Sequence, residues 1–188
     1  MANSELLELI QRYYTKNDNT PIYLRNINER RYAVNFLLHN SKGIVRLLVV
    51  FNERGDSDVI DAISDNVTVR NLTKYLKVKN NKLIILTNDA PKVRGSNVVQ
   101  SLTDEGVSVE VAAIPKKLFE TLVDRCVDNE LVLIEPSKFI FLGKYGLDNT
   151  SKSEGVTSYL NFNDVEFYNI LKGFFEQSYN NSRTGRVS

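Results

Sequence analysis

The sequence predicts an α/β protein in which a mixed, mostly parallel sheet is flanked by helices. Two apolar runs, 44–51 and 83–86, show no alternation of polar and apolar residues, which is typical of strands covered on both faces. After the second run come apolar residues at helical spacing and then another apolar run at 107–113. This order of strand, helix and strand predicts a right-handed β-α-β unit.

The other elements complete one predicted α/β domain over residues 1–179. Periodic apolar residues predict helices, and short β-branched or aromatic runs predict strands. The predicted helices cover about 4–14, 28–40, 68–79, 116–124 and 163–179, and the further strands cover 22–24, 131–134 and 139–142. Residues 143–158 read as a long polar loop, and 180–188 as a disordered tail. Arg46 lies inside an apolar strand, so it must either lie near the start of the strand or reach a partner.

The composition favours a soluble cytoplasmic protein. Apolar residues make up 42% of the chain, charged residues 25%, and the formal net charge is +1, so binding to an anion would need a local patch. No apolar run approaches the roughly 20 residues that span a bilayer, and the N-terminus is too polar for a secretory signal. Cys126 and His39 are single residues of their kinds, which excludes an internal disulfide and predicts no metal or cofactor.

One loop has the features of an anion-binding site. Lys92, Arg94, Gly95 and Ser96 follow a predicted strand and precede a helix that Ser96 is expected to cap. Ligands bind at this edge of open α/β sheets, and the unpaired amides of a helix N-terminus favour an anion. We expect Lys138 and Lys144 to add positive charge to the same site. The alternative is a solvated charged loop, because no phosphate-loop motif is present.

An acidic turn follows the first predicted central strand. Asp56, Asp58 and Asp61 lie there, and carboxylate oxygens can bind a divalent cation. Acidic turns of this kind also occur without metals. A phosphodiesterase or nuclease that uses His39, or a metal held by Asp56 and Asp58, is therefore an alternative function.

From Arg31 onward the order of elements resembles one half of the phospholipase D-like (HKD) superfamily. The matching segments are IVRLLVVF, KLIILTN, VEVAAIP, the hairpin TLVDRCVDNELVLI, FIFLG and FNDVEFYNILKGFFEQ. In that family a hairpin strand carries H-x-K, and its histidine attacks the phosphodiester. Here Val123 stands at the position of the histidine and Arg125 at that of the lysine. The family also has a downstream G-S-x-N element, and near the matching position this chain has only Gly143, Lys144 and Tyr145. Since valine has no lone pair, the resemblance implies a degenerate, non-catalytic and homodimeric member.

The segments FNERGDSDVI, VTVRNLTKYLKVKNNKLIILTNDAPK and LVDRCVDNELVLIEP are also similar to the N-terminal domain of a eukaryotic-type RNA polymerase subunit. That domain has a restriction-endonuclease-like fold without an active site. Glu29 and Glu110 are the only acids near suitable strands, and neither forms the E-x-K element of a working endonuclease. This resemblance likewise implies an α/β fold without catalytic groups.

These observations predict a non-catalytic binding or regulatory protein. Its partner would be nucleic acid, another phosphate-bearing ligand or a protein, and not a membrane. A purely structural homodimer that pairs through Tyr13 and Tyr14, or through the edge of the sheet, is a further alternative. The many Lys and Asn residues suggest an AT-rich genome such as that of a phage or mobile element.

Overall fold

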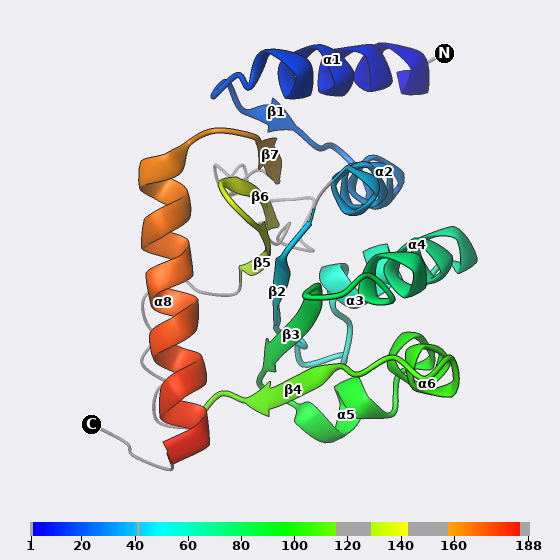
Figure 1. The fold of residues 1–188 in the computed structure, drawn as a ribbon, viewed down its shortest axis with the longest axis vertical. Coiled ribbons are helices and arrows are strands. Elements are labelled where there is room, and N and C mark those ends of the chain that lie inside the picture. Colours follow the sequence, from blue (N-terminus) through cyan, green and yellow to red (C-terminus); the bar gives the residue numbers. More distant parts are fainter. Residues whose placement is uncertain (1, 41, 116–128, 143–157, 185–188) are drawn as a thin grey trace.

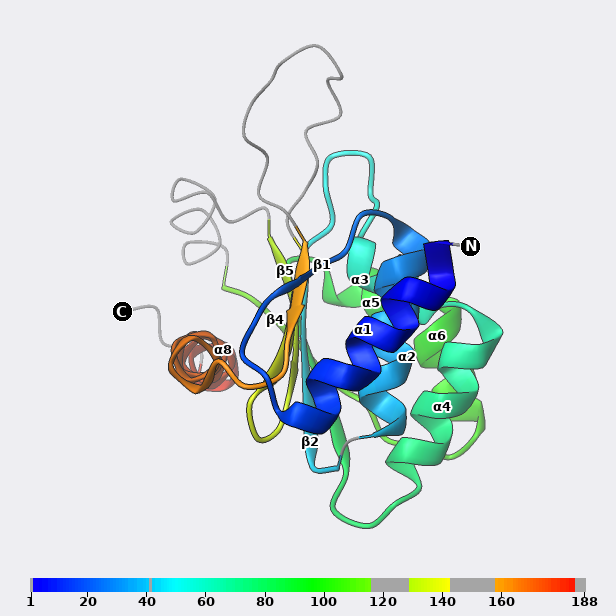
Figure 2. The same ribbon diagram turned by 90° about the horizontal axis from the view of Figure 1, so that it is seen from above.

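The computed structural model describes residues 2–40, 42–115, 129–142 and 158–184. Within them, one seven-stranded sheet lies between two layers of helices (Figures 1 and 2). The strands are β1 (Ile22–Tyr23), β2 (Ile44–Val49), β3 (Lys82–Thr87), β4 (Glu110–Ala113), β5 (Glu130–Ile134), β6 (Lys138–Leu142) and β7 (Tyr159–Asn161). The helices are α1 (Ala2–Lys16), α2 (Ile27–His39), α3 (Asp58–Ile63), α4 (Asn66–Leu76), α5 (Ala90–Arg94), α6 (Asn97–Asp104) and α8 (Val165–Thr184).

The predicted mixed sheet flanked by helices is confirmed. Its strand order is β1-β7-β6-β5-β2-β3-β4. Strands β3 and β4 pair in parallel, as the predicted β-α-β unit requires, and β2 also pairs in parallel with β3. The other four pairings are antiparallel, so the parallel share is smaller than predicted. For β5 and β6 the reason is their tight connection, because a short turn reverses the chain and allows antiparallel pairing only.

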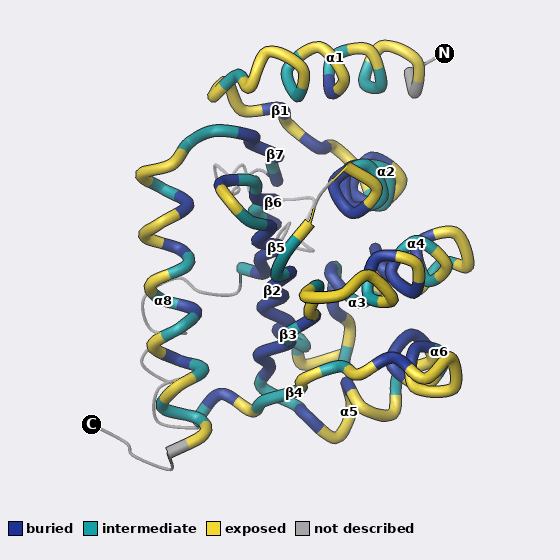
Figure 3. Tube along the Cα trace, viewed as in Figure 1, coloured by how far each residue is buried: buried dark blue, intermediate teal, exposed yellow. Residues whose placement is uncertain are grey.

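Strand β2 lies in the interior of the sheet, between β5 and β3, and is buried from Val45 to Val49 (Figure 3). Val45, Leu47 and Val49 pack into the core under the helices α2 to α6. Leu48 and Val50 pack into the second core, under α8. Alternate residues thus enter different cores, which explains why the run lacks polar residues at every second position.

Helix α8 covers the face of the sheet opposite to α2 and α4 (Figure 2). Two aromatic side chains of this helix, Tyr168 and Phe175, are buried against the sheet. The helix continues to Thr184, so the prediction of a disordered tail from residue 180 is wrong for 180–184. The hydroxyl of Tyr179 donates to Glu110 of β4 at 2.5 Å and ties the last turns of the helix to the sheet.

Outside the described residues lie the predicted helix at 116–124, Cys126, and the predicted loop at 143–158 except for its last residue. Within the described part of the chain, no helix is both long enough and apolar enough to cross a membrane.

Arg46 has the partners that its position in a buried strand requires. Its side chain is 6% exposed and donates to Glu135 at 3.1 Å and to Glu176 of α8 at 2.9 Å. Lys172 Nζ lies 3.8 Å from the same Glu135 oxygen. The guanidinium therefore links β2, the end of β5 and α8 in one ion network.

We expect Arg46→Met to lower the free energy of unfolding by about 2–3 kcal/mol. The substitution keeps an apolar stem but removes the charge, and the loss is smaller than for a fully buried pair because Glu135 and Glu176 keep access to water. Urea unfolding measures the difference. Lys77→Met, which breaks the exposed pair of Lys77 with Glu105, is the control and should change stability little. Equal effects of the two substitutions would contradict a special role for Arg46.

Candidate functional site

The loops after β2 and β3 lie side by side at the carboxyl edge of the sheet, as predicted. Asn88 joins them, because its Oδ1 accepts from Phe51 N at 2.9 Å and its Nδ2 donates to Phe51 O at 3.0 Å. The acidic turn and the Lys92 loop therefore share one edge. This is the edge at which the sequence predicted an anion site.

Lys92 and Arg94 do not converge on a common point at this edge. Lys92 Nζ donates to Gly55 O at 2.6 Å and lies 4.6 Å from the centre of the Phe51 ring, on the β2 side of β3. Arg94 Nη2 donates to Val111 O of β4 at 2.9 Å, on the other side of β3. Each cation binds a backbone carbonyl, so the two hold neighbouring segments in place.

The predicted polar loop contains the short helix α5. Asp89 caps it by accepting from Lys92 N at 3.0 Å, and Gly95 ends it. The carboxylate of Asp89 thus occupies the N-terminus of α5, whereas the anion site was predicted at the N-terminus of the following helix, α6. Ser96 stands at the N-cap position of α6, but its hydroxyl donates to Val93 O at 2.6 Å. The prediction that the Ser96 side chain caps this helix is therefore wrong.

Lys138 lies at the opposite edge of the sheet from Lys92. It begins β6 and pairs with Ile134, the last residue of β5, near the amino ends of β2 and β3. Its Nζ is 5.6 Å from the ring centre of Tyr14, and burial lowers the pKa of its ammonium group. Lys144 lies outside the described residues. The prediction that Lys138 joins the Lys92 loop is therefore wrong, because the strand order cannot be read from local sequence.

The carboxyl edge also contains a buried acid that was not among the predicted site residues. Glu130, the first residue of β5, is 0% exposed. Its Oε1 accepts from Val50 N at 2.9 Å and from Ser57 Oγ at 2.5 Å, and its Oε2 accepts from Val59 N at 3.1 Å. The carboxylate thus holds the start of α3 against β5. An acid directly before the apolar run LVLI was the available signal.

Burial raises the pKa of Glu130 to about 7, and the negative charge of Asp58 acts in the same direction. The hydrogen bonds from Ser57, Val50 and Val59 act against this rise, since they stabilise the ionised form. Because the group is closed to solvent and fully hydrogen-bonded, we interpret Glu130 as a structural anchor.

The acidic turn is arranged around an arginine. Asp58 forms an ion pair with the buried Arg30 of α2. The pKa of Asp61 is raised by burial first, and then by the charges of Asp58 and Asp56. Among the residues that the structure describes, no group of three or more His, Cys, Asp or Glu side chains is placed to hold a metal ion. His39, the other candidate, ends α2 near the amino edge and is exposed.

A segment rich in cations lies on and after α4, and it was not among the predicted sites. Residues 66–88 contain five cations and no Asp or Glu. Arg70, Lys74 and Lys77 stand at i, i+4 and i+7, so they share one face of the helix. We call the following exposed residues the basic strip: Lys42, Arg70, Lys74, Lys77, Lys79 and Lys82.

The strip continues from α4 to the amino edge of the sheet. There Lys82 N donates to Gly43 O at 3.1 Å, which places the Lys42 and Lys82 segments together. Acidic groups of α6 flank the other side of the strip: a groove of about 460 Å³ is lined by Arg70 and Lys74 on one wall and by Asp104 and Glu105 on the other. Lys77 Nζ lies 2.8 Å from Glu105, and this hydrogen bond and charge lower the pKa of Glu105. Glu105 therefore partly neutralises the strip.

The raised pKa of Glu130 predicts a stability that depends on pH. The folded state binds a proton more tightly than the unfolded state, so this group stabilises the fold below its ordinary pKa of 4.5, and the gain disappears as the pH rises through about 7. The shift corresponds to about 3 kcal/mol. We expect Glu130→Gln to remove this part of the pH dependence, as measured by urea unfolding between about pH 4.5 and pH 8.

Glu53→Gln, at an exposed acid of the β2–α3 loop, is the control and should keep the wild-type pH profile. The amide introduced by Glu130→Gln cannot accept through its nitrogen, so the bond from Val59 N would also be lost. A constant loss of stability is therefore expected beside the altered slope. A Glu130→Gln profile parallel to that of the wild type would contradict the assignment.

No known family model matches this chain, and no curated protein matches its sequence. Its fold is similar to that of TrmBL2, an archaeal chromatin protein, with a TM-score of 0.54 and 15% identity over 96% of this chain. The chain spans 60% of the length of the TrmBL2 chain. Two other solved structures have lower TM-scores. Nuc from Salmonella typhimurium, a phospholipase D family member, has a TM-score of 0.48 and 7% identity, over 80% of this chain and 86% of the Nuc chain. NucT from Helicobacter pylori has a TM-score of 0.45 and 14% identity, over 86% of this chain and 94% of the NucT chain. The likeness to TrmBL2 shows the fold alone. The degenerate phospholipase D-like half-domain stays a prediction, and Val123 and Arg125 lie outside the described residues.

Proposed function

We propose that this chain binds nucleic acid, without catalysis, through the basic strip. The observation that carries the proposal is the acid-free segment 66–88, whose five cations are all exposed and three of which share one face of α4. Nucleic-acid affinity arises chiefly from cations that neutralise phosphates. The similarity of the fold to TrmBL2, whose structure is described as showing a mode of DNA binding, supports the same function.

The geometry of the strip suits a phosphate backbone. Arg70 and Lys77 are seven residues apart on α4, which corresponds to about 10 Å along the helix axis. Cations on one helix face can therefore contact successive phosphates of one strand, and Lys79, Lys82 and Lys42 extend the contact beyond the end of the helix. The net charge of the whole chain is only +1, so this local concentration of charge must supply the attraction.

The predicted site at Lys92 and Arg94 remains a second candidate for phosphate contact, because both side chains are exposed. Their hydrogen bonds to backbone carbonyls commit part of their donor capacity, which favours the strip over this site. The catalytic alternative would need Asp58 as a metal ligand. The carboxylate of Asp58 is instead paired with Arg30, which disfavours this alternative.

A regulatory role and a homodimer also stay proposals. The Tyr14 ring packs edge-on against Phe36 at 5.3 Å and Phe162 at 5.5 Å, and its hydroxyl donates to Asn40 O. These contacts use much of the Tyr13–Tyr14 face within the chain, so a dimer through this face is the less favoured alternative.

Replacing Arg70, Lys74 and Lys79 together by Gln should weaken binding to a short labelled DNA duplex by roughly tenfold or more at low salt. Each lost phosphate contact should also reduce the slope of log K against log[salt] by about 0.9. Fluorescence anisotropy over a salt series measures both quantities. Glutamine keeps the helix propensity of α4, so the fold should be retained.

The matched control is the triple change of Arg12, Lys16 and Arg25 to Gln, which removes the same charge from exposed positions at the N-terminal end of the chain. It should leave the salt slope near that of the wild type. Lys92→Gln with Arg94→Gln tests the other candidate. An unchanged slope in the α4 variant, together with a reduced slope in the Lys92–Arg94 variant, would move the interface to the carboxyl edge.

Glu105→Gln should strengthen binding to the same duplex. The substitution removes the carboxylate that holds Lys77 and so releases one more cation to the strip. We expect a tighter complex and a salt slope that is steeper by up to about 0.9. Glu53→Gln removes an equal charge at the carboxyl edge and is the control; if both variants gain equally, only the net charge matters and the strip is not the interface.

A further inference from the structure

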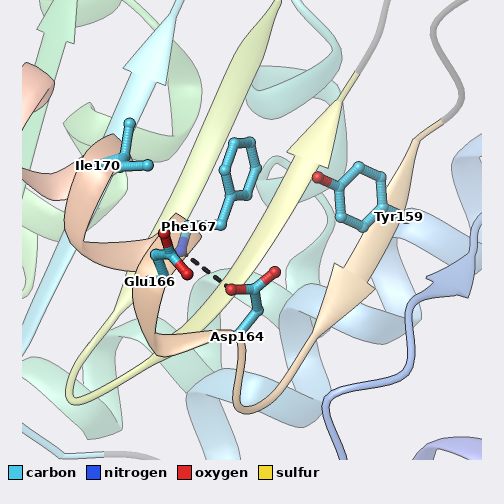
Figure 4. A pocket seen from close by; sticks show the side chains of 5 residues that line it. All are labelled: Tyr159, Asp164, Glu166, Phe167 and Ile170. Carbon is cyan, nitrogen blue, oxygen red and sulfur yellow. Dashed lines mark hydrogen bonds between the residues drawn. The ribbon is translucent and has the colours of Figure 1, made fainter.

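An open hollow lies at the start of α8, on the face of the sheet that α8 covers. Its volume is about 400 Å³, and five side chains line it: Tyr159, Asp164, Glu166, Phe167 and Ile170. Figure 4 shows Tyr159 on β7 and the other four on or directly before the first turns of α8. The hollow is thus built where a strand passes into the last helix.

Aromatic rings form a fixed wall of this hollow. The Tyr159 ring stacks on Phe141 at 5.7 Å and meets Phe139 edge-on at 5.8 Å. Phe139 in turn meets Phe167 edge-on at 5.5 Å. Because β6, β7 and α8 each supply a ring, the aromatic faces are held in place before any ligand arrives.

Two carboxylates make the hollow negative. Asp164 Oδ1 accepts from Phe167 N at 3.0 Å and so caps α8, and Glu166 is exposed on the first turn. Burial raises the pKa of the Tyr159 hydroxyl, and the charge of Asp164 raises it further. A helix N-terminus contributes only about half a positive charge, so the two carboxylates outweigh it.

Exposed apolar side chains surround the hollow. Among the described residues, five large apolar side chains are exposed, and three of them lie here: Tyr23 (58%), Val165 (49%) and Ile170 (60%). The Tyr23 ring is 6.5 Å from that of Tyr159, so it extends the aromatic wall onto the edge strand β1. A cluster of this kind marks an interaction site more often than scattered apolar residues do.

We propose that this hollow binds an arginine or lysine side chain from a basic and apolar segment of a protein partner. Carboxylates beside electron-rich rings attract an organic cation through charge and through cation–π contact. The volume suits one long side chain, and Tyr23 and Ile170 offer apolar contact to its neighbours. The same carboxylates repel phosphate, so nucleic acid is excluded as the occupant. The inference does not depend on the proposed function of the basic strip.

A short synthetic peptide with arginine between two leucines is the probe, and its analogue with neutral citrulline is the comparison. The binding is followed by NMR of the labelled full chain. We expect saturable shifts of the resonances of Tyr159, Phe167 and Ile170 with the arginine peptide, and roughly tenfold weaker binding of the citrulline peptide.

Asp164→Asn with Glu166→Gln should weaken the arginine peptide roughly tenfold, while the fold is retained because asparagine also caps helices. Phe167→Leu tests the ring without changing the charge. Glu8→Gln with Glu53→Gln removes two exposed carboxylates elsewhere and should leave binding unchanged.

Three results would overturn the proposal. They are equal binding of the citrulline peptide, shifts confined to residues outside the hollow, and binding of free N-acetylarginine amide as tight as that of the peptide. The last result would assign the hollow to a free small cation, since the apolar neighbours would then add nothing.

Discussion

The cost of burying polar groups in the central layer of the sheet shapes the rest of this structure. Strand β2 is covered on both faces, so a charge beside it needs a partner supplied by another element. Arg46 meets this condition through Glu176 of α8, and Glu130 meets it through Ser57 and the Val59 amide of α3. Each buried charge therefore fixes one helix on one face of the sheet. The positions of α8 and α3 depend on these bonds as well as on apolar packing.

This division separates the charges of the chain into two groups. The buried ones in the described part of the chain, Glu29, Arg30, Arg46 and Glu130, are bonded to other parts of the fold and hold it together. The exposed ones are distributed unevenly, because cations gather on α4 and at the amino edge while carboxylates meet aromatic rings at the start of α8. A net charge of +1 conceals this pattern, since it reports only the sum.

Local sequence predicted the parts of the fold whose determinants are local. The apolar runs of β2 and β3 identified strands buried on both faces, and the parallel pairing of β3 and β4 followed from the helix predicted between them. The position of Arg46 predicted that it either lies near the start of its strand or reaches a partner, but the partner, Glu176, is 130 residues away in the chain. No local pattern contains that information.

The site was harder to predict for the same reason. Lys138 and Lys92 were expected together, yet their edges of the sheet became known only with the strand order. Ser96 was expected to cap α6, whereas its hydroxyl donates to Val93 O, and Asp89 caps the additional short helix α5.

The arrangement of the two proposed surfaces has a physical consequence. Helix α4 and helix α8 lie on opposite faces of the sheet (Figures 1 and 2), so the basic strip and the acidic hollow face away from each other. The full thickness of the sheet separates them, and exposed charges beyond about 10 Å are largely screened at physiological salt. A phosphate backbone on the strip would therefore neither block nor strongly repel a basic protein segment at the hollow. The two surfaces can be occupied together, and a chain with a net charge near zero can in this way join an anionic polymer to a cationic partner.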